Sequence, residues 1–413
     1  MSLAFDFGLA IYAGSLSNAS EKRQEYHEEI GRILTLAFVV AALVTLVLQS
    51  ASGLVAGLLQ GEESKAAVKE AIRVSCVGLV GGRMITSIGL ALLSSQSRYN
   101  QILIISLFQS GSVLAVNTLT MVLRLDFARN LHALSFLNCA WALIVLFISV
   151  SDGDFYCLRR GLALRDISFK KLIQTLKKSL AVFPGSFGSS CFVYLDKLIV
   201  GSFIGAQDLA FYTVATMVAG QINSVTALIA QPIIHLVPTA DSDVKIKDNL
   251  DRYAKLVLVS CPALGFLLIL FAPIIRIVFF PALSDVWQIA MIEQVIAIMC
   301  FIYSIYSVNC YGHYYWLARQ RYKFVSAVTM FSSFGTLALM FVVRGAFGLL
   351  GLVACNFVYA TSVLLTVQAI RSRAAQVKLA LCAGALIYAA SLILIFLRFS
   401  HSREYSDLGL FLT

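Results

Sequence analysis

Long apolar runs recur along the chain and determine its predicted architecture. A helix that crosses a membrane needs about 20 apolar residues, and runs of that order follow one another as far as residue 397. The run at 33–48, ILTLAFVVAALVTLVL, does not alternate between apolar and polar positions, as a strand of a membrane β-barrel would. The pattern predicts twelve helices, over residues 1–15, 31–58, 71–94, 100–123, 131–150, 179–203, 208–234, 256–280, 287–316, 323–343, 346–369 and 377–397.

The composition predicts an all-α polytopic membrane protein. Of its 413 residues, 59% are hydrophobic and 13% are charged, whereas soluble domains carry roughly 25% charged residues. The nine cysteines fall mostly in or beside apolar runs and never form a CxxC spacing. We interpret them as small packing residues and expect no disulfide framework, no metal site and no cofactor.

The loops between the predicted helices differ in basic charge. One alternating set holds 21 of the 32 Lys and Arg residues and the opposite set holds 8. Basic loops stay in the cytoplasm, so the first set is predicted to be cytoplasmic. The net charge of +10 therefore indicates the topology of a multi-pass protein in the cytoplasmic membrane, and we do not expect nucleic-acid binding.

The longest and most basic loop covers residues 151–178. Apolar residues among its Lys and Arg side chains predict one apolar face, formed by Leu162, Leu164, Ile167, Leu172, Ile173 and Leu176. Such a segment can lie on the membrane surface against anionic lipid headgroups. The alternative is an ordinary solvated linker.

Weak matches at an offset near 220 indicate an internal repeat. Four pairs occur in the same order, namely Arg32 with Arg252, Arg98-Tyr99 with Arg321-Tyr322, Arg124 and Phe127 with Arg344 and Phe347, and Asn138 with Asn356. Six predicted helices separate equivalent positions, and an even number implies parallel repeats. We therefore expect two six-helix bundles that enclose a central cavity.

The repeat also predicts the domain boundaries. Residue 1 corresponds to about residue 221, so the first bundle is expected to lack its first helix. The predicted parts are an incomplete N-terminal bundle at 1–150, a basic cytoplasmic linker at 151–178, a C-terminal bundle at 179–369, and a further helix with a tail at 370–413.

Asp196 and Lys197 are adjacent charges inside a predicted span. Asp196 follows the cytoplasmic Lys178 by 18 residues, roughly 27 Å along a helix, in the outer third of the membrane. Neighbouring helix positions point about 100° apart, so we expect the two side chains to diverge and Lys197 to reach outward. Asp196 is then either a cavity-lining carboxylate of a proton or ion relay or one partner of a structural interhelical hydrogen bond.

Other polar residues in the spans are candidates for a substrate cavity. Arg83 follows Gly81-Gly82 near the middle of its predicted helix, and a cation that faces a cavity would suit an anionic substrate. The span at 208–234 carries a polar series that includes Gln221, Asn223 and Ser224. This series predicts a wet cavity wall or, alternatively, polar contacts between helices.

Arg276 and Glu293 lie at matching depths on consecutive antiparallel helices. They are 5 and 8 residues from a loop bounded by Pro281 and Asp285. We predict an ion pair between them, and a separation above about 8 Å would contradict it.

The stretch YLDKLIVGSFIGAQDLAFYTVA at 194–215 resembles the seventh helix and following turn of O-antigen and exopolysaccharide flippases. These proteins belong to the multidrug/oligosaccharidyl-lipid/polysaccharide exporter (MOP) superfamily. The stretches FDFGLAIYAGSLSNA at 5–19 and SSQSRYNQ at 94–101 are similar to the second helix and to the loop after the fourth. The matching positions of the first stretch are Asp196, Lys197, Gly201, Tyr212 and Ala215.

The resemblance implies two six-helix bundles arranged in a V and a transport function. Members of the family move undecaprenyl-diphosphate-linked oligosaccharides to the outer leaflet by alternating access, and some couple transport to an ion. Asp196 and Glu293 are the candidates for such coupling. The implied partners are the lipid-linked oligosaccharide, membrane lipids and the polysaccharide polymerase machinery.

Two other classes of function are weighed against the flippase. A drug or cation antiporter of the same superfamily would place acidic residues rather than Arg83 in its cavity. A membrane glycan polymerase or glycosyltransferase would need acidic or Arg-rich outer loops for its chemistry, and the predicted outer loops are short. No catalytic motif is present in the sequence, so we expect a transporter and not an enzyme.

Overall fold

A computed structural model of the chain describes residues 23–57, 69, 73, 76–96, 98–123, 127–150, 169–181, 183–237, 244–343 and 347–411. Every regular element within these residues is helical. The chain divides into two compact units, Met1–Ser186 (unit 1) and Phe187–Thr413 (unit 2). The boundary between these units lies in the first turn of helix α9 (Phe183–Phe203).

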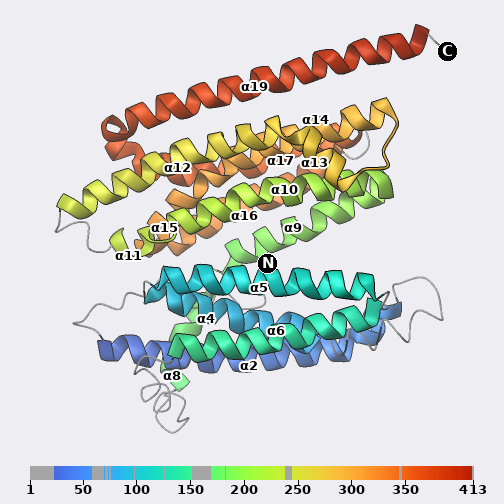
Figure 1. The fold of residues 1–413 in the computed structure, drawn as a ribbon. Coiled ribbons are helices and arrows are strands. Elements are labelled where there is room, and N and C mark those ends of the chain that lie inside the picture. Colours follow the sequence, from blue (N-terminus) through green and yellow to red (C-terminus); the bar gives the residue numbers. More distant parts are fainter. Residues whose placement is uncertain are drawn as a thin grey trace. The chain divides into compact units, whose positions relative to one another are not determined.

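Unit 1 contains a set of helices that run alongside one another and one short helix, α8, that lies across them (Figure 1). They are α2 (Arg23–Gly57), the π-helix η3 (Cys76–Gly82), α4 (Arg83–Ser95), α5 (Tyr99–Val122), α6 (Phe127–Val150) and α8 (Phe169–Leu180). The expected helix at 1–15 lies outside the described residues.

Unit 2 is built around the span Val286–Ala318, which contains α14 and α15; its apolar stretch is the most buried among the eight candidate spans, with 61% inside the protein. Figure 1 draws the long helix α19 at the edge of this unit, and α19 packs against α12 and α14. The elements are α9 (Phe183–Phe203), α10 (Ala206–Ala230), α11 (Ile233–Leu236), α12 (Val244–Leu270), α13 (Ala272–Phe279), α14 (Val286–Ser307), α15 (Asn309–Ala318), α16 (Tyr322–Val343), α17 (Gly348–Ala360), η5 (Thr361–Val363), α18 (Leu364–Ile370), η6 (Arg371–Arg373) and α19 (Ala374–Phe411).

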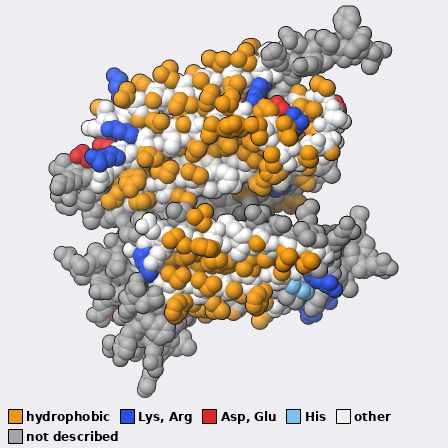
Figure 2. Space-filling view, viewed as in Figure 1, with side chains coloured by type: hydrophobic (Ala, Val, Ile, Leu, Met, Phe, Trp, Pro, Cys, Tyr) orange, Lys and Arg blue, Asp and Glu red, His pale blue; other side chains and the backbone are white. Residues whose placement is uncertain are grey.

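Eight segments of the described chain are long and apolar enough to cross a membrane. Each overlaps one of the expected spans, although the helix expected at 256–280 begins earlier, at Val244, and is divided into α12 and α13. A ninth expected span contains the shorter apolar helix Arg83–Leu93, and α5 and α9 match two more but are not among the eight. On the face drawn in Figure 2, apolar side chains cover the middle of each unit, and most charged side chains lie toward the helix ends.

The two units repeat one order of packing. In unit 1, α2 packs on η3 and α4, α4 packs on α6, and α5 packs on both α4 and α6. In unit 2, α12 packs on α14, α14 packs on α17, α15 packs on α18, and α16 packs on both α15 and α17. The matching order agrees with the parallel repeat expected from the sequence.

Two pairs of equivalent residues show how closely the packing is repeated. Asn138 of α6 and Asn356 of α17 are both buried, and each side-chain amide donates to the carbonyl oxygen four residues earlier, at 2.7 and 3.3 Å. A Cβ at Gly89 of α4 would lie 2.7 Å from Val145 Cγ1, and one at Gly312 of α15 would overlap the backbone at Thr366. Helices α4 and α6 of unit 1, and helices α15 and α18 of unit 2, therefore approach each other closely at these glycines.

Helix α8, the described end of the basic linker, packs against α2 within unit 1. The hydroxyl of Thr175 donates to Glu29 Oε1 at 2.9 Å, and Lys178 Nζ lies 4.0 Å from the same oxygen. Lys171 Nζ lies 3.6 Å from Glu28 Oε2. The linker therefore ends in a helix with polar attachments to the protein, and its residues 151–168 lie outside the described ranges.

We predict that Gly312→Ala destabilises the protein by about 1–3 kcal/mol, because the added methyl group meets backbone that cannot move aside. Gly220→Ala is the matched control, since no atom lies within 4 Å of a Cβ at that helical position, and it should be neutral or stabilising. Thermal unfolding of both variants in detergent measures the difference. Equal stability of the two variants would contradict the packing described here.

Candidate functional site

Asp196 is a buried carboxylate held by a chain of hydrogen bonds across three helices of unit 2. It lies on α9 and is 1% exposed. The hydroxyl of Tyr212 on α10 donates to Asp196 Oδ2 at 3.0 Å, and the side-chain amide of Asn356 on α17 donates to that hydroxyl at 3.3 Å. A buried charge without such partners would be strongly unfavourable, so the chain of bonds accounts for the carboxylate at this depth. We name it the Asp196 network.

Stacked aromatic rings join two of the same helices one turn away. The rings of Phe192 on α9 and Tyr359 on α17 stack with centroids 4.1 Å apart, and Tyr306 of α14 stacks on Tyr359 at 4.3 Å. The hydroxyl of Tyr359 donates to that of Tyr306 at 3.0 Å. These rings cover one another and pack next to the Asp196 network.

The expected divergence of Asp196 and Lys197 is wrong. Lys197 Nζ lies 3.3 Å from Asp196 Oδ1 and donates to the carbonyl oxygen of Val193 at 2.7 Å. The prediction considered only the angle of about 100° between neighbouring positions on a helix. The four-carbon side chain of the lysine is long enough to fold back along its own helix and overcome that angle. The ammonium group therefore points toward the N-terminal end of α9, and the predicted outward reach is wrong as well.

The sequence indicates that Tyr212 lies at the same depth as Asp196, although it does not indicate that the two side chains face each other. Residues 196 and 212 are equidistant from residue 204, at the turn between α9 and α10, so two antiparallel helices place them at one depth. Gly205 starts α10 at a φ of 121°, a conformation that glycine adopts readily. Across the same turn, a Cβ at Gly201 would lie 3.0 Å from Leu209 Cδ2.

The polar residues of α10 fall on two faces. Gln221 and Ser224 are exposed, and their side chains donate to carbonyl oxygens one turn earlier, those of Met217 and Gly220. Asn223 instead accepts from Cys310 Sγ of α15 at 3.2 Å. Gln221 and Ser224 thus lie at the surface of unit 2, whereas Asn223 forms a contact between helices.

Arg276 of α13 and Glu293 of α14 lie within ion-pair distance, as expected. Arg276 Nε is 3.5 Å from Glu293 Oε1, and the two side chains are 19% and 21% exposed. Arg276 Nε makes no hydrogen bond within the described residues, so the contact is electrostatic rather than a directed bond. Arg398 of α19 is also close enough to Glu293 for their charges to interact.

Arg83 is the first residue of α4, where the π-helix η3 ends. Its side chain is half-buried, and it makes no ion pair with any described residue. A Cβ at Gly82 would lie 3.0 Å from the carbonyl group of Asn138 on α6, so the glycine before Arg83 allows close packing as expected. Short π-helical segments are frequent at functional sites, so Arg83 stays a candidate for contact with a ligand.

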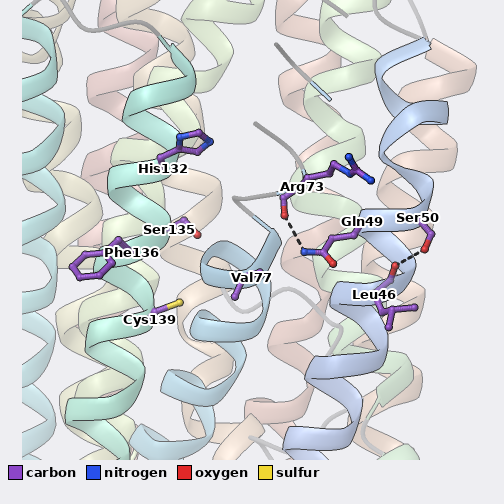
Figure 3. A pocket seen from close by; sticks show the side chains of 9 residues that line it. All are labelled: Leu46, Gln49, Ser50, Arg73, Val77, His132, Ser135, Phe136 and Cys139. Atoms are coloured by element: carbon purple, nitrogen blue, oxygen red, sulfur yellow. Dashed lines mark hydrogen bonds between the residues drawn. The ribbon is translucent and has the colours of Figure 1, made fainter. Parts of the chain in front are cut away.

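A pocket of about 750 Å³ lies within unit 1 between α2, η3 and α6 (Figure 3). Figure 3 shows η3 between the two longer helices, with Arg73 above it and His132 extending from α6 toward the Arg73 side. The side-chain amide of Gln49 donates to the carbonyl oxygen of Arg73 at 3.1 Å. The lining residues are Leu46, Gln49, Ser50, Arg73, Val77, His132, Ser135, Phe136 and Cys139.

The site residues expected from the sequence therefore belong to several separate groups, and neither unit gathers them into a single site. Asp196 and Lys197 share the Asp196 network, Arg276 and Glu293 form a separate pair, and Arg83 belongs to unit 1. Within the described parts of the chain, no group of three or more His, Cys, Asp or Glu residues is arranged to hold a metal ion. The pocket-lining residues Gln49, Arg73 and His132 were not identified as candidates from the sequence.

The fold is that of membrane transporters of the MOP superfamily. A MATE protein in complex with MaD5 matches at a TM-score of 0.67 and 14% identity, over 94% of this chain and 85% of that one. The outward-facing conformation of a multidrug resistance MATE transporter matches at 0.62 and 13%, over 94% and 85%. A MOP superfamily transporter from Pyrococcus furiosus, described as having a binding pocket of reverse polarity that suggests a different function, matches at 0.62 and 14%, over 94% and 85%.

The chain belongs to the polysaccharide biosynthesis protein family. The model of that family matches residues 13–282, more than half of the sequence. A comparison with curated protein sequences gives no match. The resemblance to MOP-superfamily flippases and the expected all-helical, two-bundle fold class are thereby confirmed.

We predict that Tyr212→Phe lowers the free energy of unfolding by about 1.5–3 kcal/mol, because it leaves a buried carboxylate without a hydrogen-bond donor. Tyr311→Phe is the matched control, since Tyr311 is fully buried and its hydroxyl has no partner within the described residues. Denaturant or thermal unfolding in detergent compares the two. A loss in Tyr311→Phe as large as that in Tyr212→Phe would contradict the proposed importance of the Asp196 network.

We also predict energetic coupling between Arg276 and Glu293. A double-mutant cycle of Arg276→Gln and Glu293→Gln should give a coupling energy of about 1 kcal/mol, because the pair is partly buried. The charge-reversed double variant, Arg276→Glu with Glu293→Arg, should recover part of the stability that each single reversal loses. Strictly additive effects would show that the two charges do not interact.

Proposed function

We propose that this protein flips a lipid-linked oligosaccharide, carried on undecaprenyl diphosphate, from the cytoplasmic to the outer leaflet of a bacterial inner membrane. The observation that carries the proposal is the match to the polysaccharide biosynthesis family in a chain with a transporter fold. The product would supply surface polysaccharide or O-antigen biosynthesis, with the polysaccharide polymerase as the next protein to act on it.

The charge inside unit 1 suits this substrate. Arg83 is a half-buried cation, and a guanidinium group can bind phosphate oxygens in a bidentate manner. Holding a cation inside a membrane costs at least ~2.5 kcal/mol, which an anionic ligand would offset. The description of the Pyrococcus furiosus structure relates pocket polarity to function in the same fold, and this supports using charge to choose the substrate class.

The exposed polar face of α10 supports the glycan part of the proposal. Gln221 and Ser224 offer hydrogen-bonding groups that sugar hydroxyls can meet. Solved structures of the same fold are described in outward-facing and inward-facing conformations, which supports alternating access as the mechanism. Asp196 and Glu293 are the proposed candidates for ion coupling.

The alternative is a drug or cation antiporter. The observation that favours it is the shared fold with multidrug resistance transporters. Such a protein would be expected to offer acidic groups to its ligand. Asp196 is 1% exposed and bonded to Tyr212 and Lys197, so its carboxylate is occupied by contacts within the protein.

Deletion of the gene in its host tests the proposal. We expect lipid-linked oligosaccharide to accumulate on the cytoplasmic leaflet, and this chain should reverse the accumulation. Arg83→Ala should reduce the complementation by at least about tenfold, the equivalent of ~1.4 kcal/mol, while Arg83→Lys should retain part of it. Intact surface glycan without accumulation would contradict the flippase, and gain of drug export by Arg83→Ala would favour the antiporter.

A further inference from the structure

The pocket of unit 1 is a candidate binding site apart from the residues assigned to transport. It lies between α2, η3 and α6 and has a volume of about 750 Å³, within the range of ligand pockets of roughly 300–1,000 Å³. None of Arg83, Asp196, Gln221 and Ser224 lines it. A role for the pocket therefore has to be argued from its own residues.

The pocket lies near the predicted outer surface of the membrane. Gln49 follows Arg32 on α2 by 17 residues, roughly 26 Å along the helix, and Arg32 pairs with Glu29 at the predicted cytoplasmic end. On α6, His132 precedes Ser149 by the same 17 residues, and the carbonyl oxygen of Ser149 accepts from Gln96 at the predicted cytoplasmic end. Because both contacts lie at the predicted cytoplasmic end, the pocket lies near the predicted outer end of α2 and α6.

The lining is positively charged at one end and apolar along the rest. Among the described residues that line the pocket, Arg73 is the only charged one. His132 Nε2 is buried and has no hydrogen-bond partner within the described residues, so it needs a ligand or water to satisfy it. The hydrogen bond from Gln49 to the carbonyl oxygen of Arg73 fixes the main chain there. An arginine and a buried imidazole nitrogen without a described partner together favour an anion.

The apolar walls indicate that the anion carries a chain. Leu46 and Val77 line the pocket and are 63% and 47% exposed, as residues open to membrane lipid would be. A free phosphate ion would leave these walls uncovered, whereas a phosphate joined to a hydrocarbon chain would contact both ends of the pocket. Figure 3 shows Arg73 and His132 on the same side of Val77. The phosphate group of such a ligand would lie on that side, and its hydrocarbon chain would lie against Val77.

We propose that this pocket binds the phosphate group of a membrane amphiphile in the outer half of the bilayer. Arg73 and His132 bind the phosphate, and Leu46, Val77 and Cys139 contact the hydrocarbon chain. The ligand is either an ordinary anionic phospholipid or a polyprenyl diphosphate carrier, since both join phosphate to a long chain. Binding at this pocket is measured without transport, so the inference can fail or succeed independently of the flippase proposal.

Alkylation of native Cys139 tests the site in the full chain purified in dodecyl maltoside. Cys139 lines the pocket, and the exposed Cys382 of unit 2 serves as an internal reference when labelling is followed peptide by peptide. Dodecyl phosphate should slow the labelling of Cys139 and leave Cys382 unchanged. Inorganic phosphate should require at least about tenfold higher concentration, because it lacks the chain. Slowing of both cysteines alike, or of neither, would overturn the proposal.

Variants separate binding by the pocket from attraction to a basic surface. Arg73→Gln should raise the half-protecting concentration of dodecyl phosphate by about tenfold, and His132→Phe should raise it by about threefold. Arg129→Gln is the matched control, because Arg129 is exposed near the same end of α6 and does not line the pocket. Equal effects of Arg73→Gln and Arg129→Gln would overturn the proposal, provided that thermal unfolding shows all three variants to be folded.

Two membrane lipids then identify the source of the ligand. Phosphatidylglycerol and a polyprenyl diphosphate are compared for protection of Cys139 at matched concentrations. Preferential protection by either one supports the site and assigns its ligand. Protection by neither, although dodecyl phosphate protects, would overturn the assignment to a membrane amphiphile.

Discussion

A charged or polar side chain inside a membrane must find its partners within the protein, because hydrocarbon supplies none. The arrangement of unit 2 follows this constraint. Asp196 is 1% exposed and accepts bonds from Tyr212 and Lys197, and Asn356 extends the chain of bonds to a third helix. Arg276 and Glu293 satisfy the same constraint between α13 and α14. Arg83, which pairs with no described residue, is the exception, and this is why it is the strongest candidate for contact with an anionic substrate.

The internal repeat explains why the same packing solutions occur twice. Asn138 and Asn356 each bond to the carbonyl oxygen four residues earlier, and Gly89 and Gly312 each allow a close helix crossing in their own unit. Small residues let helices approach where the hydrophobic effect provides no driving force between them. The two units differ in what they add to this shared frame, since unit 2 contains the Asp196 network and unit 1 contains Arg83 and the pocket.

Features that depend on segment length could be predicted from the sequence, whereas features that depend on helix rotation could not. Run lengths predicted eight spans that the structure contains, and the distances to a shared loop predicted the contact of Arg276 with Glu293. The fold-back of Lys197 toward Val193 and the pairing of Asp196 with Tyr212 require side-chain rotamers and helix facing. The pocket was not predicted because Gln49, Arg73 and His132 come from segments that meet only after packing. Depth along a helix follows from sequence, but the direction of a side chain does not.

The most direct test of the central claim is transfer of the substrate by the purified protein. The chain would be reconstituted in liposomes that carry a lipid-linked oligosaccharide only in the inner leaflet, and a lectin outside the liposomes would report the arrival of the glycan. The flippase account predicts that lectin binding rises with time in liposomes that contain the protein, and that it rises more slowly with Arg83→Ala. No rise above protein-free liposomes, together with transport of cationic drugs by the same preparation, would contradict the account.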